Sequence, residues 1–91
     1  MNENAQKTDP LLADPVYQEI VMQIRPHAAK DVTITPQSVI LSDLGMDSLA
    51  IMDFIFDLED ALDISIPMER IAEVQTLADL VTAVRKLQQE A

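Results

Sequence analysis

The residues best placed to do chemistry lie between Asp43 and Leu49, where the chain reads Asp-Leu-Gly-Met-Asp-Ser-Leu. Asp47 and Ser48 come directly before a long apolar period, so they predict the start of a helix. The Ser48 hydroxyl would then lie at the positive end of the helix dipole, beside a turn at Gly45. No base or thiol stands near it in the sequence. The hydroxyl is therefore poorly equipped to attack a substrate, but well placed to be modified by another protein.

A hydrolytic enzyme would need more than this serine. The Gly-x-Ser-x-Gly pattern is missing around Ser48, and the only histidine is His27, next to Pro26. A nucleophilic serine needs a base within hydrogen-bond reach and a residue that orients that base. A chain of 91 residues also leaves little room for a substrate cleft. We therefore expect no catalytic activity, and we expect His27 to lie at the surface where the first helix ends.

The acidic side chains do not follow a metal-binding pattern. Asp43 and Asp47 lack the glycine and the bidentate glutamate that a calcium loop requires at fixed spacing. Asp53, Asp57 and Asp60 share one side of the predicted helix, at positions i, i+4 and i+7. Such carboxylates repel one another, which favours a docking face over an acid–base pair. Only loose, non-specific binding of divalent cations is expected there.

Length and composition predict one folded domain. Hydrophobic residues make up 48% of the chain and aromatic residues 3%, so the core must be aliphatic. Cysteine is absent, which excludes disulfides and thiolate metal sites. No apolar run is long enough to cross a bilayer, and residues 1–8 do not resemble a signal or transit peptide. A monomeric, cytoplasmic protein is the resulting expectation.

The charge is strongly acidic, with 16 Asp and Glu against 6 Lys and Arg, for a net charge of −10. No Lys or Arg occurs between Lys30 and Arg70. Nucleic acid and anionic membrane surfaces are therefore unlikely partners, because both bind through basic side chains. The natural complement of this acidic stretch is a basic patch on another protein.

Hydrophobic periodicity predicts a small all-α bundle of three longer helices and one short helix, with no strand. Residues 1–13 are predicted to form a flexible tail, and residues 14–91 to form the domain. The first helix starts after the Asp14 cap and ends near Pro26. The others are predicted at about 48–62, 67–72 and from Thr76 onward.

A long loop is predicted between the first and second helices, over residues 30–47. This segment contains β-branched residues and Thr35-Pro36, but no sustained helical period. Four apolar side chains are expected to hold it against the core: Val39, Ile40, Leu41 and Leu44. Loops of this length often serve function in a small domain.

The predicted helix at 48–62 has two apolar rows. One row has the spacing of a buried face: Ile51, Phe54, Ile55, Leu58 and Leu62. The other row consists of Leu49, Met52 and Phe56, interleaved with the acidic residues Asp53, Glu59 and Asp60. This second row either packs under the long loop or forms a strip that binds a partner, with apolar anchors and an acidic rim.

These features together make the chain resemble the acyl carrier proteins. Residues 43–49 match the family's Asp-Leu-Gly-x-Asp-Ser-Leu signature. Residues 58–62 and 64–67 are similar to its acidic second helix and the connection that follows, and residues 76–81 are similar to the start of its last helix. The resemblance spans about residues 14–88 in order and spacing.

The resemblance implies a four-helix bundle of acyl-carrier type. It implies that Ser48 carries 4'-phosphopantetheine through a phosphodiester added by a phosphopantetheinyl transferase, with Asp47 as the recognition and cap residue. The arm's thiol would hold acyl chains as thioesters. Partners would be fatty-acid, lipid or polyketide biosynthesis enzymes with basic docking surfaces. The implied docking residues are Leu49, Met52, Asp53, Phe56, Glu59 and Asp60.

Some positions depart from the family's common pattern. Ala50 stands where many fatty-acid carriers have an acidic residue, Ile51 and Phe54 are bulky for positions that face the acyl pocket, and Phe56 is aromatic. These departures indicate a specialised carrier that serves one pathway. Two other functions stay open: a carrier of aminoacyl or peptidyl groups, and an unmodified acidic helical adaptor in which Ser48 is only a helix cap.

Overall fold

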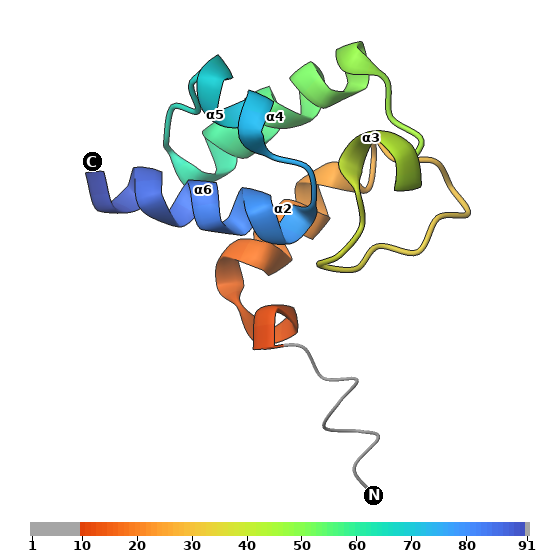
Figure 1. Cartoon of the computed structure of the whole chain (residues 1–91), viewed down its shortest axis with the longest axis horizontal. Coiled ribbons are helices and arrows are strands. Elements are labelled where there is room, and N and C mark those ends of the chain that lie inside the picture. The colour runs from red at the N-terminus through yellow and green to blue at the C-terminus, as the bar shows by residue number, and fades with distance from the viewer. Residues whose placement is uncertain (1–9, 91) are drawn as a thin grey trace, which may run out of the picture.

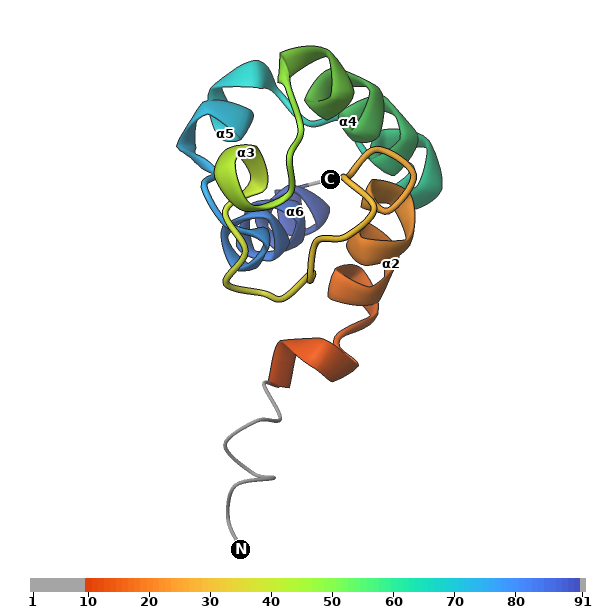
Figure 2. The same ribbon diagram turned by 90° about the vertical axis from the view of Figure 1, so that its right-hand side faces the viewer.

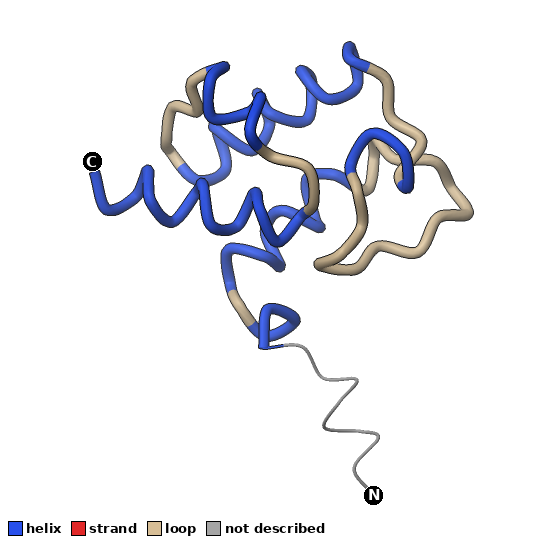
Figure 3. The backbone as a smooth tube through the Cα atoms, in the orientation of Figure 1, coloured by secondary structure: helices blue, strands red, loops and turns tan. Residues whose placement is uncertain are grey.

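The structure, a computed structural model, describes residues 10–90 (Figures 1 and 3). Its elements are the 3-10 helix η1 (Pro10–Ala13) and the α-helices α2 (Pro15–Ile24), α3 (Ile40–Asp43), α4 (Ser48–Leu62), α5 (Met68–Glu73) and α6 (Leu77–Glu90). Within residues 10–90 there is no strand, only an isolated bridge between Val39 and Thr76. The predicted all-α bundle of three longer helices and a short one between the last two is confirmed.

The apolar stripes of the three long helices meet in one aliphatic core. Helix α2 packs against both α4 and α6, which Figure 2 shows from the end of the bundle. The largest fully buried side chains are Phe54, Ile20, Ile24, Leu44, Leu58, Leu77, Leu80 and Val84. Each long helix contributes at least two of them, so the core depends on all three helices together.

Helix α2 starts as the sequence predicts and is also tied to α6. The Asp14 carboxylate accepts a hydrogen bond of 2.8 Å from the Val16 backbone N–H and caps the helix. It also accepts hydrogen bonds of 2.5 and 3.2 Å from the Arg85 guanidinium. These bonds, those from Arg85 above all, lower the pKa of Asp14 below its ordinary value. Arg85 thus joins the last helix to the start of the first long one.

The long connection predicted over residues 30–47 is present, and it contains one short helix, α3, that was not predicted. The Val39 N–H donates to the Asp43 carboxylate over 2.8 Å, which closes this single turn. A helix of 4 residues is too short to show a hydrophobic period in the sequence.

The apolar residues of this segment do not all behave as expected. Ile40 and Leu44 are buried, as predicted, and Val39 is half-buried. Leu41 is 62% exposed, so the expectation that it anchors the loop is wrong. Its neighbour Ile40 already faces the core, and one helical turn cannot bury two successive side chains against the same surface.

The segment before α3 covers the start of α6. The Ala78 N–H donates to the Pro36 carbonyl over 2.8 Å, and the Leu77 N–H donates to the Ser38 carbonyl over 3.2 Å. The Ile40 N–H in turn donates to the Gln75 carbonyl over 2.9 Å. Three backbone bonds therefore hold this loop against the connection between α5 and α6.

The predicted tail, residues 1–13, lies mostly outside the described residues. Its last four residues form η1, and the Asp14 N–H donates to the Leu11 carbonyl over 3.0 Å. Leu11 packs against the edge of the core. Ordered structure therefore begins before residue 14, while the flexibility of residues 1–9 stays a prediction.

Candidate functional site

The turn that leads to Ser48 is fixed by two buried side chains on either side of a glycine. Leu44 is fully buried and Met46 is 4% exposed. Gly45 between them has a φ of +67°, and a Cβ atom there would lie 3.0 Å from the Ala29 Cβ. The Ala29 N–H donates to the Leu44 carbonyl over 3.0 Å, which holds the turn against the chain that follows α2. Sequence reasoning missed the burial of Met46; its spacing of two from Leu44 was the available signal.

Ser48 is the first residue of α4 and is exposed. The Asp47 carboxylate caps the helix by accepting a hydrogen bond of 2.8 Å from the Ala50 N–H, as predicted. Within the described part of the chain, no group accepts a hydrogen bond from the N–H of Ser48 or Leu49. The helix therefore presents two open donors and its positive dipole end beside the serine hydroxyl.

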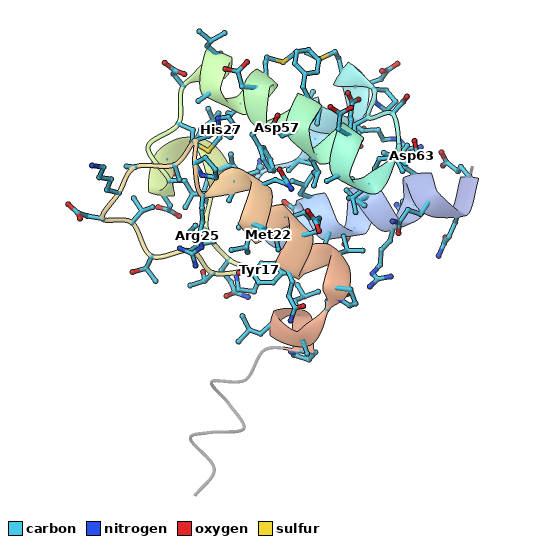
Figure 4. The ribbon with its side chains drawn as sticks, turned by 180° about the vertical axis from the view of Figure 1, so that it is seen from behind. Tyr17, Met22, Arg25, His27, Asp57 and Asp63 are labelled. Atoms are coloured by element: carbon cyan, nitrogen blue, oxygen red, sulfur yellow. The ribbon has the colours of Figure 1, made fainter. Side chains whose placement is uncertain are left out.

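No base is positioned to activate this hydroxyl. Across residues 10–90, no group forms a hydrogen bond with the Ser48 hydroxyl. The His27 Nε2 atom lies 2.8 Å from the Asp57 Oδ2 atom, a contact that joins the end of α2 to α4 (Figure 4). Since an α-helix rises 1.5 Å per residue, Asp57 lies about 13 Å along α4 from Ser48. The sequence placed His27 at the end of the first helix but gave no sign of this pairing.

The second apolar row of α4 does not pack under the loop. Leu49 is 70% exposed and Phe56 is 56% exposed, while Met52 is half-buried. The acidic side chains of Asp53 and Asp60 are exposed on the same helix. The row is thus an accessible strip of apolar anchors with acidic neighbours, whose binding role no contact in the structure tests.

Met68 extends the exposed apolar surface beyond α4. It is 61% exposed and is the first residue of α5. Sequence reasoning missed it because a single methionine after a proline shows no period.

Two acids of α4 take part in the fold itself. The Glu59 carboxylate accepts a hydrogen bond of 2.7 Å from the Ile66 N–H, and the Glu59 carbonyl accepts one of 3.2 Å from the Ile64 N–H. Glu59 therefore holds the connection to α5 after α4 ends at the left-handed Asp63 (Figure 4). Asp57 is engaged by His27. Among the acids expected on the docking side, Asp53 and Asp60 make no such contact with the rest of residues 10–90.

An apolar cavity of about 160 Å³ begins one helical turn after Ser48. Ile51, Phe54 and Ile55 of α4 form one wall. The remaining lining residues come from the α3 region, α5 and its C-terminal flank, and α6: Val39, Ile40, Leu41, Ile71, Val74, Gln75 and Leu80. Leu41 is among these residues although its side chain is 62% exposed. A cavity with so few polar groups suits a hydrocarbon chain better than a charged one.

Residues 10–90 contain neither a metal-binding cluster nor a membrane-spanning helix. No group of three or more His, Cys, Asp or Glu side chains there is arranged to hold a metal ion. None of the helices in that range has the length and apolarity needed to cross a membrane.

Comparisons with known proteins agree on one family. Residues 20–84 match the family described as "Phosphopantetheine attachment site". The chain is 45% identical over 60 residues to a probable acyl carrier protein of Caulobacter vibrioides, which covers 66% of this chain and 70% of that protein. It is 32% identical over 82 residues to the meromycolate extension acyl carrier protein of Mycobacterium bovis, which covers 84% of this chain and 71% of that protein.

A solved structure is also similar. It is described as a putative acyl carrier protein of Mycobacterium tuberculosis, with 33% sequence identity and a TM-score of 0.69. The match covers 77% of this chain and 95% of that one. The fold and the sequence signature therefore point to the same family.

Proposed function

This chain belongs to the acyl carrier proteins that bear phosphopantetheine, and on that premise we propose that Ser48 is the attachment residue of the prosthetic group. The supporting observation is the open start of α4: an exposed hydroxyl beside two backbone N–H groups that no described residue engages. A phosphate ester carries negative charge, and such charge is stabilised at a helix N-terminus. The residues present at this site thus fit the group.

The protein acts as a carrier, in our proposal, and not as a catalyst. When bound, 4'-phosphopantetheine supplies a terminal thiol, which this cysteine-free chain lacks. Ser48 provides the tether, Asp47 caps the helix and marks the serine for a phosphopantetheinyl transferase, and Gly45 lets the turn present the hydroxyl. His27 is committed to Asp57 and takes no part in the chemistry.

The apolar cavity of the protein is best suited to an acyl chain as the cargo. The cavity of about 160 Å³ is apolar and starts at Ile51, one turn from the tether. A dry cavity of about 150 Å³ holds a benzene molecule, so a short hydrocarbon segment fits without any movement of the helices. Longer chains require the aliphatic core to part. A carrier of aminoacyl or peptidyl groups would gain little from this lining, because burying unpaired polar groups is unfavourable.

The exposed strip of α4 is the proposed docking surface for partner enzymes. Leu49, Met52 and Phe56 supply apolar contacts, and Asp53 and Asp60 supply charge for basic surfaces. Glu59 belongs to the predicted docking set, and its bond to the Ile66 N–H gives it a structural role as well. Partners of this kind would include the transferase and enzymes of fatty-acid, lipid or polyketide biosynthesis, in the cytoplasm and with the carrier as a monomer.

Intact-mass measurement tests the attachment site. The purified chain is incubated with coenzyme A and a phosphopantetheinyl transferase of broad specificity. We expect the wild type to gain one arm, Ser48→Ala to gain none, and Ser42→Ala, which removes another exposed serine just upstream, to gain one arm. If the wild type gains no mass, the chain is better explained as an unmodified adaptor. If Ser48→Ala still gains an arm, the attachment residue is not Ser48.

Charge reversal on α4 tests the docking surface. Asp53→Lys/Asp60→Lys is expected to slow acyl transfer by a fatty-acid biosynthesis enzyme about tenfold at low salt, with a smaller effect at high salt. The matched control is Glu69→Lys/Glu73→Lys, which changes the net charge equally at exposed positions on α5. Equal slowing of both variants would mean that only net charge matters and that α4 is not the docking surface.

A further inference from the structure

The turn that follows α2 forms a small hollow with two cationic side chains. Arg25, Pro26 and Lys30 contribute to its wall, and the whole hollow has a volume of about 400 Å³. Arg25 follows the last residue of α2 as its C-cap, and Figure 4 shows it away from the His27–Asp57 pair. The acidic strip of α4 has no part in this lining.

These two cations are unpaired in a chain that is rich in acids. Within residues 10–90, neither Arg25 nor Lys30 forms an ion pair, whereas Arg70 pairs with Glu90 and Arg85 pairs with Asp14. The net charge is −10, so carboxylates were available to neutralise them. The lining of the hollow therefore contains two cationic residues and no acidic residue, although the protein as a whole is negative.

The floor of the hollow is apolar. Ala28, Val32 and Ile34 line it and are half-buried against the edge of the core. The lining thus combines apolar contact area with two cationic side chains, a combination that favours a ligand with one apolar and one anionic group.

Backbone bonds hold the hollow in place. The Ala28 N–H donates to the Ile24 carbonyl over 3.0 Å, and the Ala29 N–H donates to the Leu44 carbonyl over 3.0 Å. The His27–Asp57 contact fixes the same turn to α4. Little backbone ordering would therefore be required on binding.

The hollow is also close to the tether. Ala29, which lines it, contacts the turn at Leu44 and Gly45. Three residues span at most about 11 Å, so Gly45 and Ser48 are no farther apart than that. A protein that reaches Ser48 can therefore contact the hollow as well.

We propose that this hollow binds an acidic segment of a partner protein, with a carboxylate between Arg25 and Lys30 and an aliphatic side chain on the floor formed by Val32 and Ile34. Charge complementarity selects an acidic partner here, in contrast to the basic surfaces expected to meet α4. The two surfaces together fix the orientation in which a partner approaches Ser48. The proposal does not depend on modification of Ser48, because the hollow is complete in the unmodified chain.

A peptide titration followed by NMR tests the proposal on the full, unmodified chain labelled with ¹⁵N. The probe is acetyl-Glu-Ile-Glu-amide, and acetyl-Gln-Ile-Gln-amide is its neutral control. At low ionic strength we expect the acidic peptide to shift the amide signals of residues 25–34 and the neutral peptide to bind much more weakly. Arg25→Gln and Lys30→Gln are each expected to weaken binding about fivefold.

Lys86→Gln is the matched variant, because it removes one charge from an exposed lysine on α6 that also lacks an ion pair in residues 10–90. It is expected to leave binding unchanged. Equal weakening by Lys86→Gln, equal shifts with both peptides, or shifts confined to other residues would each overturn the proposal. Equal shifts with sodium acetate at the same carboxylate concentration would identify an anion site and would overturn the peptide-docking proposal.

Discussion

Helices α4 and α6 both begin with a side-chain cap, but the backbone N–H groups at the two helix starts are used differently. At α6, the Thr76 hydroxyl and the Asp79 carboxylate form reciprocal bonds of 3.1 Å with the Asp79 and Thr76 N–H groups. The Leu77 and Ala78 N–H groups donate to carbonyls of the loop before α3. At α4, Asp47 accepts one bond from the Ala50 N–H, and the donors of the first two helical residues meet no acceptor among residues 10–90.

The difference shows that a capping residue is enough to begin a helix, but that a capped helix start does not by itself provide a binding site for a phosphate group. The loop before α3 folds over α6 and uses its open donors, so that helix end is closed. Before α4 the chain turns at Gly45 and is held away by the buried Leu44 and Met46. The open donors at Ser48 are therefore a product of this turn, and they are what a phosphate ester can use.

Moving the serine from the open end to the closed end gives the largest expected effect. Ser48→Ala/Thr76→Ser leaves a serine cap followed by leucine at the start of α6. We expect no loading with phosphopantetheine in the intact-mass assay, because Thr76 is half-buried and its neighbouring donors are occupied. Loading of this variant would mean that the transferase recognises any serine before leucine at a helix start, and that the difference between the two helix ends has no effect on modification.

Gly45→Ala is expected to disturb the turn before α4, which leaves the first N–H groups of that helix accessible. The φ of +67° is unfavourable for alanine, and the new Cβ would meet the Ala29 Cβ at 3.0 Å. We expect a loss of about 2 kcal/mol in the free energy of unfolding, by chemical denaturation, together with slower loading of Ser48.

The double variant Gly45→Ala/Ala29→Gly separates the two causes. It removes the contact with the Ala29 side chain but keeps the backbone strain, so it is expected to recover loading in part. If Gly45→Ala alone keeps wild-type stability and loading rate, the turn does not set the geometry of the site.

Local signals were enough to predict the long helices and their starts. Asp14, Asp47 and Thr76 are caps in the sequence and in the structure, because a cap depends on residues within one turn. The apolar periodicity of α2, α4 and α6 also predicts their buried faces, because an amphipathic helix packs its apolar stripe against the core.

Contacts between distant segments were beyond a single sequence. The pairing of His27 with Asp57 and the bond from Ile66 to Glu59 depend on how α2, α4 and the following connection meet. Nothing local distinguishes these acids from exposed ones such as Asp53. The absence of acceptors for the N–H groups at the start of α4 among residues 10–90 could not be predicted locally either, because it depends on the path of the loop before this helix.

Removing the capping side chains of α4 and α6 tests the same comparison through a smaller expected effect. Asp47→Ala and Thr76→Ala are each expected to lower the free energy of unfolding by about 1 kcal/mol, since each leaves a helix N–H without its acceptor. This corresponds to a fall of about 4–8 °C in melting temperature for a domain of this size. Only Asp47→Ala is expected to slow loading of Ser48. Equal loading rates for the two variants would assign Asp47 a purely structural role.

The smallest expected effect concerns pH at the closed end. Hydrogen bonds from the Thr76 and Gln75 backbone N–H groups lower the pKa of Asp79 below its ordinary value of 3.8. A carboxyl group whose pKa is lower in the folded state adds stability above its unfolded pKa, and this stability is lost as pH falls through the folded pKa. Because Asp79 is exposed, we expect Asp79→Asn to cost only about 0.5 kcal/mol at pH 6. The difference from wild type in denaturant unfolding should shrink as the pH falls below 3.8. A difference that stays constant as the pH falls would show that the charge of Asp79 adds nothing to its hydrogen bonds.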